Sequence, residues 1–239
     1  VVEVICDDEG TRSVVFDEVQ GCPKGFRILI NWFTGTRKNL TLGFPSNLNK
    51  LELSEAYHQH TRELDPIQHL IVEDGPVLEN ILEGEDIDVT KFPSPLWNPA
   101  DGGRYIGTGC FNITRDPESG WINCGTYRVM VHDEKRVGLY ISPGKHGRIH
   151  RDKYMAKGEP MPVCIVVGSD PLSFLSSSTE APEGMCELDM MGAYRGEAIK
   201  CVTGKHTGLP FPANSEIVIE GFIHPGNTCL LYTSDAADE

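Results

Sequence analysis

Hydrophobic and polar residues alternate in short runs along the N-terminal part of the chain. The segments 13–16 and 26–30 are rich in β-branched and aromatic residues, and the turn-forming segment 21–25 separates them. Both segments are therefore predicted to be strands. In the segment 50–63, leucines and an alanine recur among glutamates and histidines, which predicts a helix. The segment 76–82 is expected to form a shorter helix.

A proline-rich stretch interrupts this pattern. Residues 92–99 contain three prolines, and an Asp-Gly-Gly turn follows them. Because proline continues neither a helix nor a central strand, we predict a domain boundary near residues 95–103. The expected N-terminal α/β domain then covers residues 1–100, and a second domain covers residues 101–228.

The pattern beyond this boundary is typical of antiparallel β structure. Apolar segments separated by turn-forming residues predict three strands in a meander, at residues 104–114, 121–132 and 137–142. The expected fold class is thus α+β, with an antiparallel barrel or sheet and peripheral helices. Further expected elements are a strand at 162–167, a helix capped by Asp170 with Pro171 in its first turn, a helix at 186–194 and a strand at 217–223.

Charge and hydropathy exclude two classes of partner. The chain has 239 residues with 21 basic and 35 acidic side chains, which gives a net charge of −14. It contains no long basic patch, so nucleic-acid binding is not expected. No apolar run approaches the roughly 18 residues that a transmembrane helix needs, so no membrane span is expected.

The cysteines indicate a reducing compartment. All eight are scattered along the chain without a Cys-x-x-Cys pair, so neither a structural zinc site nor a disulfide framework is predicted. We expect mostly free thiols. Since no signal peptide is recognised, a cytoplasmic location is expected.

Four side chains carry the clearest candidate chemistry. Asn123, His146 and Glu187 together offer an amide oxygen, an imidazole and a carboxylate. This mixed set suits a hard or borderline divalent ion such as manganese or magnesium. Arg128 adds a guanidinium, which can clamp a carboxylate or a phosphate.

Each of these residues also has an ordinary structural interpretation. Glu187 begins a predicted helix, where the helix dipole favours a carboxylate. Asn123 and Arg128 lie five residues apart on one predicted strand, so regular alternation would point them to opposite faces. If both serve one site, the strand must bulge, and Gly125 is the expected place. The serines at 176–178 could bind a phosphate or flavin edge, but they also fit a polar loop.

Several longer strings in a fixed order support a specific resemblance. Residues 12–228 resemble the UbiD family of prenylated-flavin-dependent decarboxylases in the order and approximate spacing of these strings. They are GPVLENILEGEDIDVTKFP, DGGRYIGTGCFNITRDPESGWINCGTYRVMV, GKHGRIH, PMPVCIVVGSDP, PEGMCELDMMGAYRGE and PANSEIVIEG.

The resemblance implies a cofactor and its ions. The family binds prenylated FMN through its phosphate and a divalent metal, usually Mn2+ (Mg2+ is the alternative), with K+ close by. The family's metal ligands fall on Asn123, His146 and Glu187. The carbonyl of Cys124 takes the place of a potassium ligand.

The resemblance also implies substrate and cofactor contacts. Arg128 matches the catalytic arginine that holds the substrate carboxylate. The implied cofactor-binding residues are Gly125, Thr126, Arg128, Lys145, His146, Ser177 and Ser178.

By the same resemblance, the expected function is reversible non-oxidative decarboxylation of aromatic or α,β-unsaturated carboxylic acids. The implied fold is an N-terminal α/β domain, a flavin-reductase-like split β-barrel and a C-terminal domain used for oligomerisation. A flavin prenyltransferase would supply the cofactor, and the full-length parent would be a homo-oligomer. The alternative is a flavin- or phosphate-binding split-barrel module without decarboxylase activity.

The C-terminal residues depart from the family pattern. An EGPFGE-type motif with the proton-relay glutamates is expected at about residues 231–236, where this chain reads LYTSDA. The segment 229–239, CLLYTSDAADE, is interpreted as a non-native, adapter-derived tail. Because the chain also begins with Val1, we expect a fragment of a longer protein that lacks the C-terminal family domain and is inactive alone.

Overall fold

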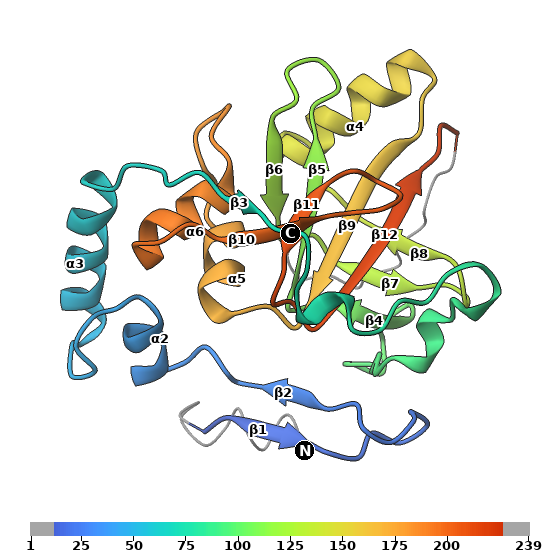
Figure 1. Cartoon of the computed structure of the whole chain (residues 1–239). Helices are drawn as coiled ribbons and strands as arrows, with labels where there is room; N and C mark the ends of the chain where they lie inside the picture. Colours follow the sequence, from blue (N-terminus) through green and yellow to red (C-terminus); the bar gives the residue numbers. More distant parts are fainter. Residues whose placement is uncertain (1–11, 227–239) are drawn as a thin grey trace. The chain divides into compact units, whose positions relative to one another are not determined.

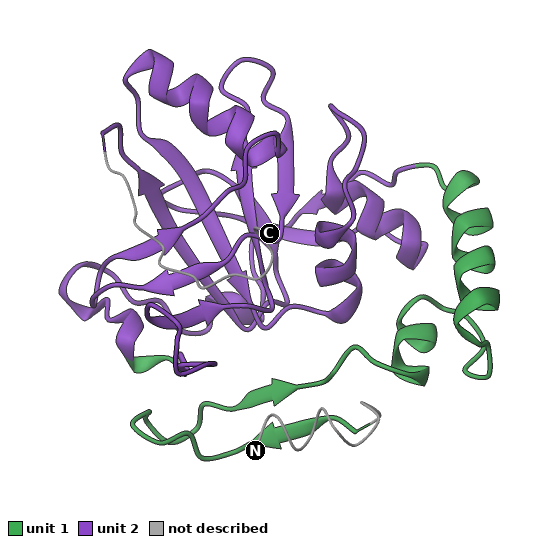
Figure 2. Ribbon diagram, turned by 180° about the vertical axis from the view of Figure 1, so that it is seen from behind, with its two compact units in different colours: residues 1–65, 91–93 green, residues 66–90, 94–239 purple. Residues whose placement is uncertain are grey.

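The computed structural model describes residues 12–226, so the expectations for residues 227–239 lie outside the described part. Contacts divide the chain into two compact units (Figure 2). The first comprises residues 1–65 and 91–93, and the second comprises residues 66–90 and 94–239. This division falls earlier in the sequence than the expected boundary near residues 95–103, which stays a prediction about domains.

The first unit contains a hairpin and two helices. Strands β1 (Val14–Phe16) and β2 (Ile28–Ile30) pair antiparallel, and helices α2 (Thr36–Thr41) and α3 (Lys50–Arg62) follow. Helix α3 begins with a capping box, in which the Asn49 side chain accepts two backbone N–H groups while the N3 glutamate bonds back. The two strands and the long helix predicted from the sequence are therefore confirmed.

The second unit is built around a four-stranded antiparallel sheet with the order β12-β9-β5-β6 (Figure 1). Its strands are β5 (Cys110–Arg115), β6 (Ile122–Gly125), β9 (Met161–Val167) and β12 (Ile217–Ile223). Strand β9 pairs along its whole length with β12 and along most of it with β5. The predicted strands at 162–167 and 217–223 are confirmed.

Two smaller sheets complete this unit. Strands β4 (Arg104–Gly107), β7 (Val129–Val131) and β8 (Val137–Leu139) pair antiparallel in the order β4-β7-β8. In the other sheet, β10 (Lys200–Thr203) pairs antiparallel with β11 (Pro210–Pro212) and parallel with β3 (Leu70–Ile71). Within residues 12–226 no sheet closes into a barrel, and the α+β class with antiparallel sheets is confirmed.

The expected three-stranded meander is wrong. The segments 104–114 and 121–132 each break into two strands, and the halves join different sheets. A glycine ends the first half at both breaks, and a side chain from just beyond the break folds back over it. Cys110 covers Gly107, and Tyr127 covers Gly125, so a Cβ atom on either glycine would collide with that side chain. The chain therefore ends one strand at Gly125 instead of bulging there.

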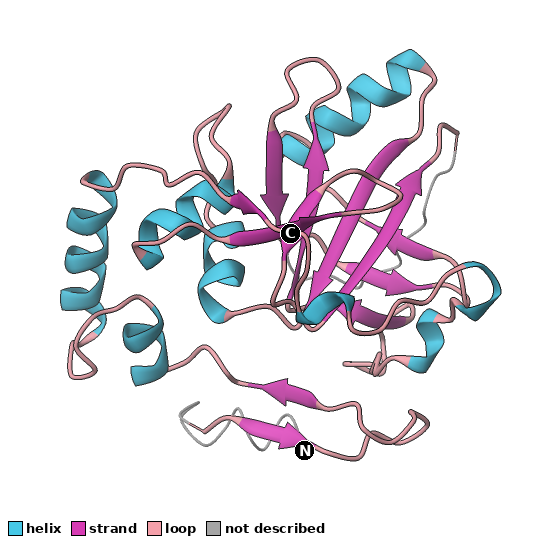
Figure 3. Ribbon diagram, viewed as in Figure 1, coloured by secondary structure: helices cyan, strands magenta, loops and turns pink. Residues whose placement is uncertain are grey.

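Three helices surround the central sheet (Figure 3). Helix α5 (Pro171–Ser178) has the predicted Asp170 cap, whose carboxylate accepts two backbone N–H groups, and α6 (Glu187–Arg195) ends at Gly196 as predicted. Helix α4 (His146–Lys157) was not predicted. The short helix expected at 76–82 is only the 3-10 turn η1 (Pro76–Leu78), and two more turns follow, η2 (Gly84–Asp86) and η3 (Val89–Lys91).

The main hydrophobic core lies between the central sheet, the β10-β11 hairpin and α6. Phe111 and Ile113 from β5 and Leu188 and Met191 from α6 are fully buried in it. Burial of these large side chains stabilises the placement of α6. Helix α6 therefore begins at a defined position next to β6, and that position determines where Glu187 lies.

Candidate cofactor and metal site

All the sequence-predicted site residues except Arg128 line one pocket of the second unit. The pocket has a volume of about 70 Å³. Sites that enclose a small molecule usually have roughly 300 Å³ or more, so this pocket encloses only part of such a ligand. Its lining residues are Asn123, Cys124, Gly125, Thr126, Tyr127, Lys145, His146, Ser177, Ser178, Thr179, Glu180 and Glu187.

Two helices begin at this pocket. Lys145 is the N-cap and His146 the first residue of α4, and Cys186 and Glu187 have the same positions in α6. Neither N-cap side chain bonds to the helix backbone. The positive end of a helix dipole favours an anion, and a phosphate group has the matching charge. The pocket therefore combines an anion-binding backbone with metal-ligating side chains.

Glu187 is a buried carboxylate at the base of the site. It is 2 % exposed, and its Oε2 atom accepts a hydrogen bond of 2.7 Å from the backbone N–H of Cys124. Burial raises the pKa of Glu187 to about 7, although the Cys124 N–H favours the charged form. A divalent cation at this carboxylate would supply the positive charge that the ionised form needs in a buried position.

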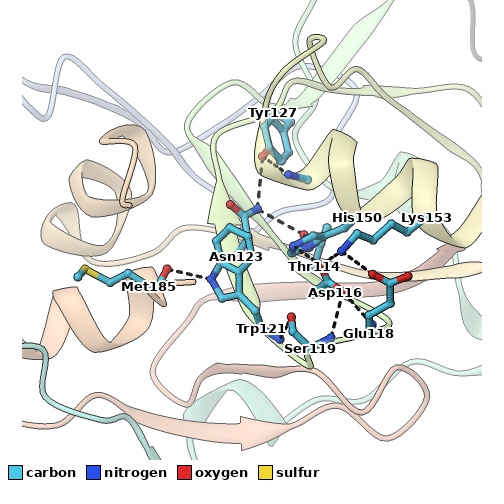
Figure 4. Close-up of polar contacts among 11 residues, drawn as sticks. Thr114, Asp116, Glu118, Ser119, Trp121, Asn123, Tyr127, His150, Lys153 and Met185 are labelled. Atoms are coloured by element: carbon cyan, nitrogen blue, oxygen red, sulfur yellow. Dashed lines mark hydrogen bonds and ion pairs between the residues drawn. The ribbon is translucent and has the colours of Figure 1, made fainter. Parts of the chain in front are cut away.

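Asn123 is buried with its amide nitrogen engaged (Figure 4). Its Nδ2 atom donates to Thr114 Oγ1 at 3.3 Å and to Tyr127 Oη at 3.4 Å. The carbonyl oxygen is thereby directed away from both partners. Thr114 in turn bonds the buried His150, with 3.0 Å between Oγ1 and Nδ1. These contacts hold Asn123 in an orientation that offers oxygen to a cation.

Tyr127 occupies the space that two glycines leave. A Cβ atom on either Gly125 or Gly147 would overlap the Tyr127 ring, so both positions require glycine for this packing. The phenol oxygen accepts from Asn123 Nδ2 and, at 3.2 Å, from the backbone N–H of Gly147. Tyr127 therefore connects β6 with the first turn of α4, which carry two of the candidate metal ligands.

The variant Tyr127→Phe tests this connection. Loss of the phenol oxygen leaves the buried Gly147 N–H without its acceptor, so we expect the free energy of unfolding to fall by about 1–3 kcal/mol. Because Asn123 loses one of its two partners, Mn2+ affinity should fall by about 10-fold. Urea denaturation and Mn2+ titration measure the two effects.

Tyr140→Phe is the matched control, because Tyr140 is 46 % exposed and lies outside the pocket. It should change neither quantity. An unchanged Mn2+ affinity in Tyr127→Phe would show that Tyr127 does not orient Asn123.

Trp121 packs between two histidines. Its ring centroid lies 4.7 Å from that of His146 and 5.0 Å from that of His150, both in edge-to-face geometry. The indole Nε1–H donates to the backbone oxygen of Met185 at 3.0 Å (Figure 4). Trp121 therefore limits the rotation of the His146 ring next to the pocket.

Asp116, Lys153 and His150 form a polar network next to Thr114 and Asn123 (Figure 4). Burial alone would raise the pKa of Asp116, but hydrogen bonds from Lys153, at 2.6 Å, and from two backbone amides lower it to about 2. Burial lowers the pKa of His150 to about 4, so its ring is neutral near pH 7. A neutral His150 keeps one ring nitrogen available for Thr114, and through Thr114 it supports Asn123.

The remaining predicted residues differ in their exposure and in the hydrogen-bond partners that they already have. Lys145 is exposed and pairs with Glu180, 2.8 Å from Nζ to Oε2. The Ser177 and Ser178 hydroxyls donate to carbonyls of their own helix. Thr126 is exposed at the pocket. Arg128 is also exposed but does not line this pocket, so its predicted role with the substrate stays a prediction.

The donor set fits a hard or borderline divalent ion together with a phosphate. Asn123 and Glu187 contribute oxygen and His146 contributes nitrogen, all from the lining of one pocket. Lys145 and the positive ends of the two helix dipoles favour an anion here. Sequence reasoning had no signal for Tyr127, Trp121 or the Thr114–His150 pair, because their partners are set by the fold.

Comparison with known proteins identifies the family. The model of the UbiD 3-octaprenyl-4-hydroxybenzoate carboxy-lyase Rift-related domain matches residues 70–230. The chain belongs to the UbiD family. A similar curated relative is the pyrrole-2-carboxylic acid decarboxylase of Pseudomonas aeruginosa, 33% identical over 212 residues, or 89% of this chain and 42% of the relative. Ferulic acid decarboxylase 1 of Saccharomyces cerevisiae is 32% identical over 217 residues, or 89% and 42%.

Solved UbiD-class structures share the fold. The vanillic acid decarboxylase of Sedimentibacter hydroxybenzoicus in closed form gives a TM-score of 0.83 at 27% identity, covering 90% of this chain and 46% of that one. HmfF of Pelotomaculum thermopropionicum in complex with prFMN gives 0.82 at 25% identity, covering 94% and 51%. The predicted family is therefore confirmed. This UbiD-family chain spans less than half the length of the curated relatives named above.

Two further observations concern the described residues of the UbiD-family chain. The cysteines at positions 22, 110, 124, 164, 186 and 201 are free thiols. None of the described helices combines the length and apolar character that crossing a bilayer requires.

Proposed function

We propose that this chain forms the cofactor-phosphate and metal-binding part of a prenylated-FMN-dependent decarboxylase. Its substrates would be aromatic or α,β-unsaturated carboxylic acids, in keeping with relatives named for pyrrole-2-carboxylic and ferulic acids. The observation that carries the proposal is the meeting of Asn123, His146 and Glu187 in one pocket at the start of two helices.

Each element of the pocket has a defined part in this proposal. Asn123, His146 and Glu187 would hold Mn2+ or Mg2+, whose positive charge would favour binding of the cofactor phosphate. Lys145 would exchange its partner Glu180 for that phosphate. The carbonyl of Cys124 would contribute to a K+ site. When bound, prenylated FMN supplies the electron sink for loss of carbon dioxide.

Substrate binding and proton transfer involve residues outside the pocket lining. Arg128 would hold the substrate carboxylate, and its guanidinium suits a bidentate contact. The proton donor is expected in the EGPFGE-type motif, and the residues at 231–236 read LYTSDA and lie outside the described residues. We therefore propose that residues 1–239 alone bind the cofactor weakly and do not turn over.

The cellular setting follows from the same assignment. The parent enzyme would act in the cytoplasm, take its cofactor from a flavin prenyltransferase and work as a homo-oligomer. The net charge of −14 argues against nucleic acid as a partner.

FMN titration with and without Mn2+ tests the site directly. Because metal and phosphate would bind as one unit, Mn2+ should tighten FMN binding by about 10-fold or more, within the usual range of coupling between ligands. Riboflavin lacks the phosphate and is the matched ligand, so its binding should not respond to Mn2+. FMN binding that ignores Mn2+ would favour the flavin-binding module without decarboxylase chemistry.

A second measurement tests turnover. Purified residues 1–239, supplied with prenylated FMN and Mn2+, should release no carbon dioxide from cinnamate-like or hydroxybenzoate-like acids. Robust release would show that the chain contains a proton donor that we have not assigned.

A further inference from the structure

A second cluster of metal-ligating side chains also involves the first turn of α6. His69, Cys186 and Asp189 each place one ligand atom within 4.8 Å of the other two. None of the three lines the pocket that contains Glu187. The cluster thus brings together an imidazole, a thiol and a carboxylate from segments far apart in the sequence.

The fold holds these three residues in place. Cys186 is the N-cap of α6 and Asp189 lies three residues later, so the helix presents both on one side. Asp189 Oδ1 accepts the backbone N–H of His69 at 2.9 Å and lies 2.7 Å from its Nδ1 atom. The backbone N–H of Ile67 donates to the Asp189 carbonyl at 3.1 Å. The segment before β3 is therefore already docked on α6.

The geometry points to a zinc-class ion at His69, Cys186 and Asp189. Zinc binds thiolate, imidazole and carboxylate at roughly 2.0–2.3 Å, which puts ligand atoms about 3–4 Å apart, so the cluster needs only small side-chain shifts. The sulfur selects zinc over manganese or magnesium. Three protein ligands leave one tetrahedral position for water.

Partial exposure gives an ion access to this cluster. The side chains of His69 and Asp189 are 16% and 21% exposed, so the site is neither sealed nor fully hydrated. A bound ion would tie the β3 segment to α6 across about 120 residues of sequence. The sequence contained no Cys-x-x-Cys pair, and this set became visible only when the fold brought His69 next to α6.

Sulfur distinguishes this cluster from the cofactor pocket in an experiment. The Asn123, His146 and Glu187 set contains no sulfur, whereas the second cluster contains Cys186, so a thiolate-to-cobalt charge-transfer band that depends on Cys186 reports the second cluster. Titration of the whole chain with Co2+ should give this near-ultraviolet band with one ion per chain. Cys186→Ser should abolish it, and Zn2+ should displace Co2+ and remove it.

Matched variants separate the two sites. His146→Ala removes a ligand of the cofactor pocket but none of the cluster and should leave the band intact, and Cys22→Ser removes a thiol that is not part of the cluster and should also leave it intact. His69→Gln keeps the thiol but removes a metal ligand. Loss of a residue that only hydrogen-bonds to a ligand can lower metal affinity by roughly 100-fold, so loss of the ligand itself should lower Zn2+ affinity by more. Circular dichroism confirms that each variant compared is folded.

Two outcomes would overturn the proposal. One is the absence of a charge-transfer band in the folded wild-type chain under reducing conditions. The other is a band that survives in Cys186→Ser, which would assign the sulfur to a different cysteine. If Cys186→Ser does not fold, an unchanged Zn2+ affinity in folded His69→Gln rejects the proposal by itself.

Discussion

Replacement of Glu187 by glutamine is expected to lower Mn2+ affinity by more than about 100-fold, the upper end of what loss of an outer-shell partner costs. Glu187→Gln keeps the size of the side chain and an oxygen near the Cys124 N–H, but it removes the negative charge. The other two proposed ligands, Asn123 and His146, carry no negative charge, so no other side chain of the set replaces it. Isothermal titration with Mn2+ measures the effect.

Glu183→Gln is the matched control for this variant. Glu183 lies four residues earlier, is exposed and does not line the pocket. It removes the same charge from the chain and should leave Mn2+ affinity unchanged. Equal losses in both variants would mean that net charge alone governs Mn2+ binding, and an unchanged affinity in Glu187→Gln would remove Glu187 from the ligand set.

Glu187→Gln is also expected to stabilise the metal-free protein at neutral and alkaline pH. Burial raises the pKa of Glu187 from 4.5 to about 7, so the folded chain retains a proton that the unfolded chain releases. The wild type therefore loses stability as pH rises from the unfolded to the folded pKa, and above pH 7 this loss reaches about 3 kcal/mol. Glutamine does not titrate and avoids the loss.

A difference measurement isolates this effect. His150 and Asp116 also titrate abnormally, but they contribute equally to both proteins. Between about pH 5 and about pH 8, the free energy of unfolding of Glu187→Gln minus that of wild type should rise by about 2–3 kcal/mol. Saturating Mn2+ should reverse the order of stability. If this difference in unfolding free energy does not change with pH, then Glu187 does not have a raised pKa in the folded chain.

The parts of the fold that the sequence predicted correctly have local signals. Asp170 with Pro171 marks the start of α5, and Gly196 marks the end of α6, so each helix end depends on residues within one turn. The strand breaks at Gly107 and Gly125 have no equally clear signal, because strand-forming residues lie on both sides of each glycine. Each break depends on a side chain folding back over the glycine, which is a tertiary contact.

The sequence predicted the residues of the candidate site better than the elements and contacts that hold them. Asn123, His146 and Glu187 were predicted from their side-chain chemistry and from the family resemblance, and the structure places all three in one pocket. Helix α4 was missed because its sequence, HGRIHRDKYMAK, is rich in charge and has no marked apolar face, so no helix was predicted there. Contacts of Tyr127 and Trp121 were missed because periodicity says nothing about which side chains meet across elements.

The short strand β3 has a consequence for how the chain is made. Leu70 and Ile71 pair in parallel with Lys200 and Cys201, so β3 is synthesised long before its partner strand leaves the ribosome. Pairing of such distant segments is slow because a long loop must close first. A nascent chain therefore carries β3 as an unpaired, apolar strand edge, and a chaperone that covers it until β10 emerges would protect the chain from aggregation.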